Sequence, residues 1–393
     1  MASTPDLQRH RSFFTVDDVN VDDLRALVDT ITPAERYPNA EAIDREVVVY
    51  DMAVERSPEQ RQAMLEELAD VFGGGPGVVV MRNAVAPEVI ARATEAFEAL
   101  IEQEKADGIG RGDHFAAPGA NDRVWNALEK LAVADPETFV DYYEFEALQL
   151  VSTAWLGPAY QVTSQLNVVN PGGLAQAPHR DYHLGFMTDE QAERYPAHVH
   201  AVSPMLTLQG AVAHVDMPVE SGPTMLLPHS HKYGPGYLAW RRPEVIELFA
   251  ERHVQTELAA GDAAFFNPAV FHGAGTNHTA GEHGIKRMGN LLQISSAMGI
   301  ALEAVDRDRM CRAVLPSLQA RRRAGWSTEA LDRAIAATAF GYPFPTNLDR
   351  DPPIDGLAPP SQADLLRDAV LDGSSVDEFA AALDAYASRR RTH

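Results

Sequence analysis

A histidine and a carboxylate stand two residues apart in the segment Gln176-Ala177-Pro178-His179-Arg180-Asp181. Side chains on an extended segment point to the same face at every second residue, so His179 and Asp181 are expected to converge. Two histidines and one carboxylate on one face of an octahedron bind Fe(II) and leave the opposite positions open. The chain therefore needs a second, distant histidine, and His272 in the segment Phe271-His272-Gly273 is the candidate.

A buried cation is expected near this site. Arg287 opens an apolar run that ends at Ser296, and a buried guanidinium can hold a carboxylate through two parallel hydrogen bonds. We also expect Gly273 and Gly275 to allow a tight backbone near the metal, and Asp262 to stabilise the turn before the strand that carries His272. Together these residues predict a site that holds a metal and a carboxylate side by side.

The elements that position these residues can be expected from the pattern between residues 160 and 296. Residues 160–168 alternate between apolar and polar, and 205–215 and 287–296 are longer runs of strand-forming residues. Turn signals separate them, which favours a β-sandwich or jelly roll with helices outside, in an α+β fold. The insert 187–204 would then be a lid beside the metal.

Helical patterns flank this region. On the N-terminal side, helices are expected to begin at Ser57-Pro58 and Ala86-Pro87 and to cover residues 123–133. Beyond Gly299 they are expected over 301–315, 327–340, 361–371 and 375–388, the last with a capping box at Ser375 and Glu378. We divide the chain into a helical extension (1–75), a β-rich core with the candidate metal site and the insert 187–204 (76–300), and a second helical extension (301–393). The last helices would pad the sheet or form a subunit contact, so the oligomeric state stays open, a homodimer included.

Composition restricts the partners. The formal net charge is -23 and the sequence pI is about 4.9, so the field around the molecule repels phosphate backbones and anionic lipid surfaces. Cys311 is the only cysteine, which excludes an internal disulfide and a thiolate zinc site. No apolar run approaches the roughly 20 residues that span a bilayer. We expect a cytoplasmic protein that binds a small-molecule substrate and neither nucleic acid nor membrane.

In order and spacing, these segments resemble the phytanoyl-CoA dioxygenase family of Fe(II)- and 2-oxoglutarate-dependent oxygenases, from about Gly77 to Ser296. The resemblance implies a double-stranded β-helix (jelly-roll, cupin-like) core and the co-substrates 2-oxoglutarate and O2. It implies that the Fe(II) ligands are His179, Asp181 and His272. It also implies that Arg287 pairs with the distal carboxylate of 2-oxoglutarate, and that the co-substrate pocket is lined by Gln176, Thr224 and Gln165.

This chain departs from some relatives after the second histidine, where Ala274 or Gly275 replaces a hydroxyl residue. Halogenating relatives lack the carboxylate ligand, whereas Asp181 is present here. Hydroxylation is therefore the expected outcome, with desaturation, ring formation or epimerisation as alternatives.

Other histidines could compete with this set for a metal. His214 and Asp216 repeat the His-x-Asp spacing, but Asp216 stands where relatives carry a structural acidic residue, so we expect His214 to be a core histidine with satisfied hydrogen bonds. The pairs His198/His200 and His229/His231 lack a partnered carboxylate and are expected to make loop hydrogen bonds.

Substrate contacts are expected at the root of the lid and in the loop 109–120. His183 lies two residues beyond Asp181 and should face the same side, where it either contacts substrate or packs. The other candidates for substrate contact are Tyr182, Phe186 and His114.

Three classes of function remain open at this point. An oxygenase would need the three ligands and Arg287, a cupin-like metal isomerase or hydrolase would not need the arginine, and a non-catalytic small-molecule binding protein would need neither His272 nor Arg287. The residues favour an oxygenase acting on a small metabolite, with natural-product biosynthesis as one setting. These residues do not identify the substrate.

Overall fold

The structure is a computed structural model that describes residues 12–108, 121–280, 284–354 and 356–392 of the 393-residue chain. Its centre is an eight-stranded mixed sheet in the order β1-β2-β3-β8-β6-β10-β5-β4. In the described chain, β2 and β3 are parallel and the other neighbouring pairs of this sheet are antiparallel. The strands are β1 Ala42–Asp44, β2 Val47–Asp51, β3 Val78–Arg82, β4 Asn121–Val124, β5 Gln161–Val169, β6 Thr207–Ala213, β8 Ala263–Phe266 and β10 Arg287–Ser295.

The three predicted strand runs are neighbours in this sheet, as β6, β10 and β5. β10 pairs along its whole length with β5, from Arg287 opposite Val169 to Ser295 opposite Gln161. On its other side β10 pairs with β6, where Gln293 lies opposite Gln209. Most residues of the three strands are buried because helices cover one face and the second sheet and loops cover the other.

The N-terminal segment differs from the helical extension that we expected. β1 and β2 hydrogen-bond to the edge of the main sheet, and the four residues Val47 to Tyr50 are at most 2% exposed. Three successive β-branched residues favour a strand, and pairing with β3 outweighs the acidic, helix-like composition around them. The boundary at residue 75 remains a prediction, but part of the segment before it belongs to the sheet.

A second, small sheet lies against the first. β7 (Met225–Leu227) pairs with β9 (Phe271–Gly273), and single bridges continue the pairing on both sides: Leu226 with Val254, and His179 with His272. The mixed α+β class with a large sheet is thereby confirmed. A jelly-roll arrangement of the two sheets remains a prediction.

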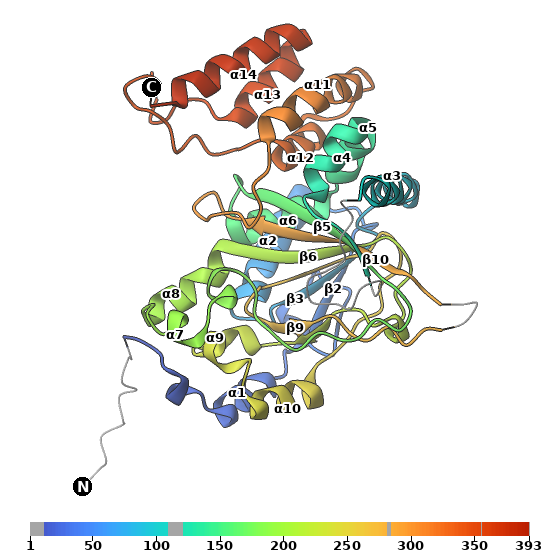
Figure 1. Ribbon diagram of the computed structural model, residues 1–393, viewed down its shortest axis with the longest axis vertical. Coiled ribbons are helices and arrows are strands. Elements are labelled where there is room, and N and C mark those ends of the chain that lie inside the picture. The colour runs from blue at the N-terminus through green and yellow to red at the C-terminus, as the bar shows by residue number, and fades with distance from the viewer. Residues whose placement is uncertain (1–11, 109–120, 281–283, 355, 393) are drawn as a thin grey trace.

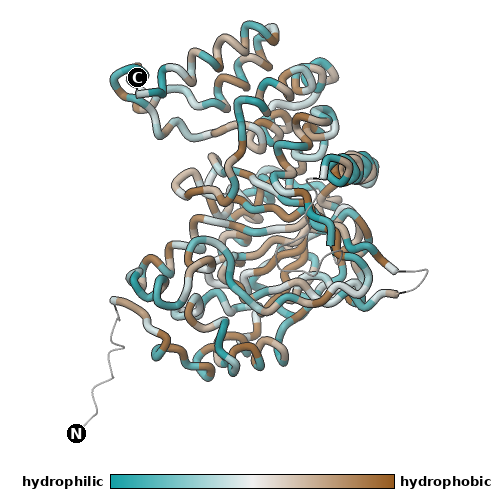
Figure 2. The backbone as a smooth tube through the Cα atoms, viewed as in Figure 1, coloured by the Kyte–Doolittle hydropathy of each residue, from teal (hydrophilic) through white to brown (hydrophobic). Residues whose placement is uncertain are grey.

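Helices cover the sheets and extend the molecule. Figure 1 shows α11 to α14 gathered at one end and α1 and α10 at the opposite end. In Figure 2 the C-terminal helices alternate between apolar and polar colours along each turn, as expected of helices with one buried face. The helices are α1 Val21–Val28, α2 Pro58–Gly73, α3 Pro87–Ala106, α4 Ala127–Ala134, α5 Pro136–Tyr143, α6 Glu146–Leu156, α7 Asp189–Ala192, α8 Ala197–Val202, α9 Gly236–Ala239, α10 Pro243–Arg252, α11 Arg307–Arg323, α12 Thr328–Thr338, α13 Gln362–Asp372 and α14 Val376–Arg390.

Several helix starts agree with the prediction. Ser57 caps α2 and Ser375 caps α14, each with a reciprocal capping box. The helix expected over 123–133 is wrong at its start, because residues up to Val124 pair with β5 and the helix begins only after Asn126, which has a positive φ of 51°. Within the described residues, no helix is both long and apolar enough to cross a bilayer.

Candidate metal centre

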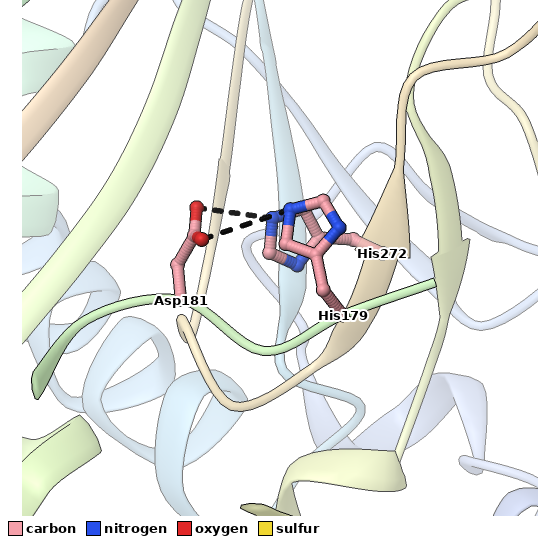
Figure 3. Close-up of side chains that lie close together, drawn as sticks. All are labelled: His179, Asp181 and His272. Carbon is pink, nitrogen blue, oxygen red and sulfur yellow. Dashed lines mark ion pairs between the residues drawn. The ribbon is translucent and has the colours of Figure 1, made fainter. Parts of the chain in front are cut away.

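Backbone pairing brings the two histidines together. The N–H of His179 donates to the carbonyl oxygen of His272 at 2.9 Å, and the N–H of His272 donates back at 3.1 Å. Directly paired residues project side chains to one face, and the ring centroids lie 4.4 Å apart. Asp181, two residues on, points to the same place: its carboxylate oxygens lie 3.6 Å from Nε2 of His179 and 3.5 Å from Nε2 of His272. Figure 3 shows the three side chains converging.

The second nitrogen of each ring is already bonded. Nδ1 of His179 lies 2.9 Å from the carbonyl oxygen of Ala177, and Nδ1 of His272 lies 2.9 Å from that of Val270. Because a carbonyl oxygen only accepts, each Nδ1 carries the proton, and each Nε2 keeps a lone pair that faces the other ligands. This is the arrangement that metal-binding histidines use.

The donor set fits a metal ion. One donor atom from each of the three residues can be chosen so that all lie within 4.8 Å of one another, which makes this the one such group among the described residues. Donors bound at about 2.1 Å on neighbouring octahedral positions would lie about 3 Å apart, so the carboxylate needs to approach each ring by only about 0.5 Å. The residues therefore fit a mononuclear centre with two nitrogen ligands and one oxygen ligand.

Gln209 on β6 orients the carboxylate. Its amide Nε2 donates to Oδ2 of Asp181, the oxygen that faces His272. Burial alone would raise the pKa of Asp181, but the polar contacts with His272, followed by His179 and Gln209, hold that pKa well below its usual range. Burial and the neighbouring His272 lower the pKa of His179. Both shifts favour a charged carboxylate beside a neutral imidazole, which is the state that binds a metal.

The three side chains line a cavity of about 250 Å³ that also contains Arg287. Arg287 is 7% exposed, and its Nη1 donates to the carbonyl oxygens of Ser221 at 3.0 Å and Gly275 at 3.2 Å. Burial lowers its pKa to about 10, and no carboxylate of the described residues contributes to that shift. A buried guanidinium held by carbonyls and facing a cavity is suited to bind an anion.

The expected glycine and turn roles are present. A Cβ on Gly275 would lie 2.9 Å from the carbonyl oxygen of Pro223, so only glycine fits this close approach. Asp262 accepts from the backbone N–H groups of Asn83 at 2.8 Å and Ala259 at 2.9 Å, which stabilises the turn before β8. The strand carrying His272 follows β8.

Gln176, Thr224 and Gln165 all line the same cavity. Oε1 of Gln176 accepts from the N–H of Ala274 at 3.1 Å, so this side chain also joins its segment to β9. Oε1 of Gln165 accepts from a guanidinium nitrogen of Arg123. The structure brings these residues together with the three ligands, and their contact with a co-substrate remains a prediction.

The substrate residues at the root of the lid are placed differently from expectation. Tyr182 and His183 have φ values of 64° and 42°, so the chain leaves the extended conformation immediately after Asp181. His183 therefore does not continue the alternation: its Nδ1 lies 3.1 Å from Oγ of Ser203, and neither it nor the buried Tyr182 lines the cavity. Phe186, 60% exposed, does line it. His114 lies outside the described residues.

The rival histidines are structural. Oγ1 of Thr94 and the hydroxyl of Tyr142 each lie 2.9 Å from a ring nitrogen of His214, which confirms a core histidine with both nitrogens bonded. His229 corrects one expectation: it has a carboxylate partner, Glu46, 2.9 Å from its Nε2. That partner is remote in the sequence, so spacing could not reveal it.

Among the residues that line the cavity and that sequence reasoning missed are Arg123, Trp125, Gln209 and Gln293. The guanidinium carbon of Arg123 lies 4.3 Å from the ring centre of Trp125. The two glutamines face each other across β6 and β10, and the amide oxygen of each lacks a hydrogen-bond partner among the described residues. A polar residue within an apolar strand run was the available signal for both glutamines.

A mixed α+β protein with two histidines and one carboxylate converging in a cavity, beside a buried arginine, defines a candidate mononuclear metal centre. The chain belongs to the phytanoyl-CoA dioxygenase (PhyH) family: the family model matches residues 75–287, more than half of the chain. This confirms the resemblance found in the motifs. No curated protein matches the sequence.

Solved structures show a likeness at low identity. The chain is similar to the epimerase SnoN in complex with Fe3+, alpha ketoglutarate and nogalamycin RO, with 20% identity, 60% of this chain and 85% of that chain covered, and a TM-score of 0.40. It is similar to AviO1 from Streptomyces viridochromogenes Tue57, with 21% identity, 63% and 100% covered, and a TM-score of 0.44. The carbocyclase SnoK from nogalamycin biosynthesis matches with 18% identity, 59% and 84% covered, and a TM-score of 0.42.

Proposed function

We propose that this protein is an Fe(II)- and 2-oxoglutarate-dependent dioxygenase that oxidises a small molecule, with release of succinate and CO2. One observation carries the proposal: His179, Asp181 and His272 converge in the same cavity that contains Arg287, whose guanidinium has no carboxylate partner among the described residues. A cupin-like isomerase or hydrolase would use the three ligands but would have no need of that arginine.

The residues have distinct tasks in this proposal. The three ligands would hold Fe(II), which when bound would supply O2 activation coupled to the decarboxylation of 2-oxoglutarate. Arg287 binds the distal carboxylate of 2-oxoglutarate and so orients its keto acid end. Gln176, Thr224 and Gln165 complete the walls around the co-substrate. Gln209 holds Asp181 in the orientation that faces both histidines.

Hydroxylation is the outcome that we propose. Asp181 occupies the ligand position that halogenating relatives leave open for a halide. With that position filled, transfer of oxygen to the substrate is the expected reaction. Desaturation, ring formation or epimerisation would instead depend on where the substrate is held. Product mass after turnover under labelled O2 with excess chloride distinguishes these outcomes, and a chlorinated product would contradict the role given to Asp181.

We also propose that the two sheets form a jelly roll, with the ligand segments on the small sheet and Arg287 at the start of β10 on the large one. β9 is paired on both edges: with His179 on one side, through His272, and with β7 on the other. In this arrangement the metal lies between two sheets, where packed strands hold the ligands rigidly.

The decisive experiment uses purified protein under anaerobic conditions. Fe(II) and then 2-oxoglutarate are added while the visible charge-transfer absorbance is followed, and succinate is measured after O2 is admitted. We expect absorbance that needs both additions, and succinate that needs all three. Metal binding with no response to 2-oxoglutarate would instead favour a metal isomerase or hydrolase. Absence of metal binding would leave a small-molecule binding protein.

A further inference from the structure

A second cavity, of about 620 Å³, lies between the main sheet and the C-terminal helices. Its walls come from the first residue of β5, the segment 297–308, the connection 340–345 after α12, and α14. None of the residues assigned to the metal centre lines it. The volume is in the range of small-molecule sites.

Two arginines line this cavity, and neither forms an ion pair with a carboxylate of the described residues. Arg307 is 3% exposed, and its Nη1 and Nη2 donate to the carbonyl oxygens of Ala337, Thr338 and Val162. Arg390 donates through Nη2 to the carbonyl oxygens of Pro343 and Pro345, while its Nη1 is buried and has no hydrogen-bond partner among the described residues. A buried cation without an anion is costly, so an anionic guest would be stabilised here.

The cavity also contains two carboxylates, and both are already engaged. Asp306 caps α11 by accepting from the N–H of Arg309 at 2.9 Å, and Asp308 accepts from the amide of Gln362 at 2.5 Å. Burial is the main cause that lowers the pKa of Arg307, to about 10, and neither aspartate contributes to that shift. The two acids therefore do not neutralise the buried guanidinium.

Aromatic rings supply the remaining wall. Phe340, Tyr342 and Phe344 are between 36% and 41% exposed, and the last two meet edge to face with centroids 5.7 Å apart. Phe340 also lies under the guanidinium of Arg307, 5.0 Å from its ring centre. Partly exposed rings offer a packing surface for another flat apolar ring, and the neighbouring guanidinium groups offer hydrogen bonds to an acidic group on it.

We propose that this cavity is a second ligand site for a small aromatic anion, whose ring packs against Tyr342 and Phe344 and whose acidic group is bound by Arg390 and Arg307. The site is independent of the proposed oxygenase activity. It adjoins the metal cavity through one segment, because Ile300 lines the second cavity and Leu302 lines the first.

The test uses two dyes with the same rings: the anion 8-anilinonaphthalene-1-sulfonate and the neutral N-phenyl-1-naphthylamine. Binding to the full chain is followed by fluorescence titration. We expect the anion to bind at least tenfold more tightly, and Arg390→Gln to weaken it by about tenfold, as loss of one charge-assisted hydrogen bond implies. The same substitution should leave the neutral dye unchanged. Arg391→Gln, which removes an identical charge at an exposed neighbouring residue, should affect neither dye.

A second pair of variants keeps the test independent of Arg390. Tyr342→Ala should weaken both dyes, whereas Leu357→Ala, at a 98% exposed residue of the same connection, should weaken neither. Hydrogen exchange should slow in residues 299–306 when the anion binds. Three results would each overturn the proposal. The two dyes could bind with equal affinity, the affinity of the anionic dye could be unchanged by both Arg390→Gln and Tyr342→Ala, or 2-oxoglutarate could displace the anionic dye.

Discussion

At the scale of single residues, the metal centre depends on which nitrogen of each histidine is free. In His179 and His272 a backbone carbonyl accepts the Nδ1 proton, so Nε2 is left for the metal. In His214 both nitrogens are bonded, to Thr94 and Tyr142, so none is left. The His-x-Asp spacing alone therefore does not identify a metal ligand. The hydrogen bonds of the histidine ring distinguish a ligand from a core histidine.

Iron stoichiometry tests this assignment. His179→Ala and His272→Ala should each reduce bound Fe(II) from about one per chain to nearly none, because two ligands do not hold the ion against buffer. The control is His214→Asn, which alters the rival pair and should keep its iron. The content is measured by elemental analysis after gel filtration, with circular dichroism to verify the fold. Iron lost from the His214 variant and kept in the other two would reverse the ligand assignment.

The second residue-scale prediction concerns the fork of Arg287. Arg287→Lys keeps the charge but loses the two-pronged geometry, so 2-oxoglutarate should bind more weakly by about 1–3 kcal/mol. Anaerobic titration of the iron-loaded protein measures this affinity. Arg312→Lys, which changes a surface arginine paired with Asp384, should leave it unchanged. An unaltered dissociation constant for the Arg287 variant would remove this residue from the co-substrate site.

At the scale of elements, the loop before β7 helps to position the guanidinium of Arg287. Gly222 has a φ of 72°, and a Cβ there would lie 2.4 Å from the carbonyl oxygen of Thr276 and 2.5 Å from that of Gly275. This close approach brings the carbonyl of Ser221, in the loop, beside the carbonyl of Gly275, which follows β9, and both accept from Arg287.

Gly222→Ala should therefore weaken 2-oxoglutarate binding although residue 222 has no side chain of its own in the cavity. The positive φ costs on the order of 1 kcal/mol for alanine, and the backbone clash adds to it. Gly325→Ala is the matched control, because Gly325 has a φ of 92° but nothing within 4 Å of the added Cβ. Both variants should lose stability in urea titrations, and only Gly222→Ala should lose co-substrate affinity. Equal affinity in the two variants would contradict the role of the loop.

The insert 187–204 is the other element with a predicted task. Asp189 pairs with Arg241 at 2.9 Å and with Arg242 at 3.0 Å, but these partly exposed ion pairs contribute little stability each. We expect the insert to close over substrate, as lids do that exclude water from a reactive centre. Amide exchange in 187–204 should slow when substrate joins the iron and 2-oxoglutarate complex, while exchange in α13 stays constant. Unchanged exchange in the insert would count against a lid.

The elements also show how far the sequence reaches. β5, β6 and β10 were predictable because their apolar runs are long and rich in strand-forming residues. β4 was not, since Asn121–Val124 becomes a strand only by pairing with β5. In the site, His179 and Asp181 were predictable from the alternation of side chains in an extended segment, and His272 from the need for a second, distant histidine. The expectation that His183 faces the same side as Asp181 was wrong, because Tyr182 and His183 have positive φ values, which non-glycine residues rarely adopt. Arg123 lines the cavity only through the tertiary fold, so no spacing could point to it.

At the scale of the whole molecule, the buried histidine His214 links folding to pH. It is 4% exposed, between α3, α5 and the main sheet, and burial lowers its pKa to about 3. The hydroxyl of Thr94 already donates to the carbonyl of Ile90, so Nδ1 of His214 donates to Thr94 and Nε2 accepts from Tyr142. The folded state therefore needs the neutral ring.

In the unfolded chain this histidine takes up a proton near pH 6.5, while the folded protein resists protonation down to about pH 3. Its contribution to stability is therefore complete above pH 6.5 and is lost as the pH falls toward 3, at up to about 1.4 kcal/mol per pH unit. Urea unfolding between pH 7.5 and 5 measures the slope. His214→Asn should be less stable at pH 7.5 but should show a slope shallower by about 1 kcal/mol per unit below pH 6. His198→Asn, at an exposed residue, should keep the slope of the unmodified protein, and an identical slope in the His214 variant would mean that this ring is not the neutral, buried group described here.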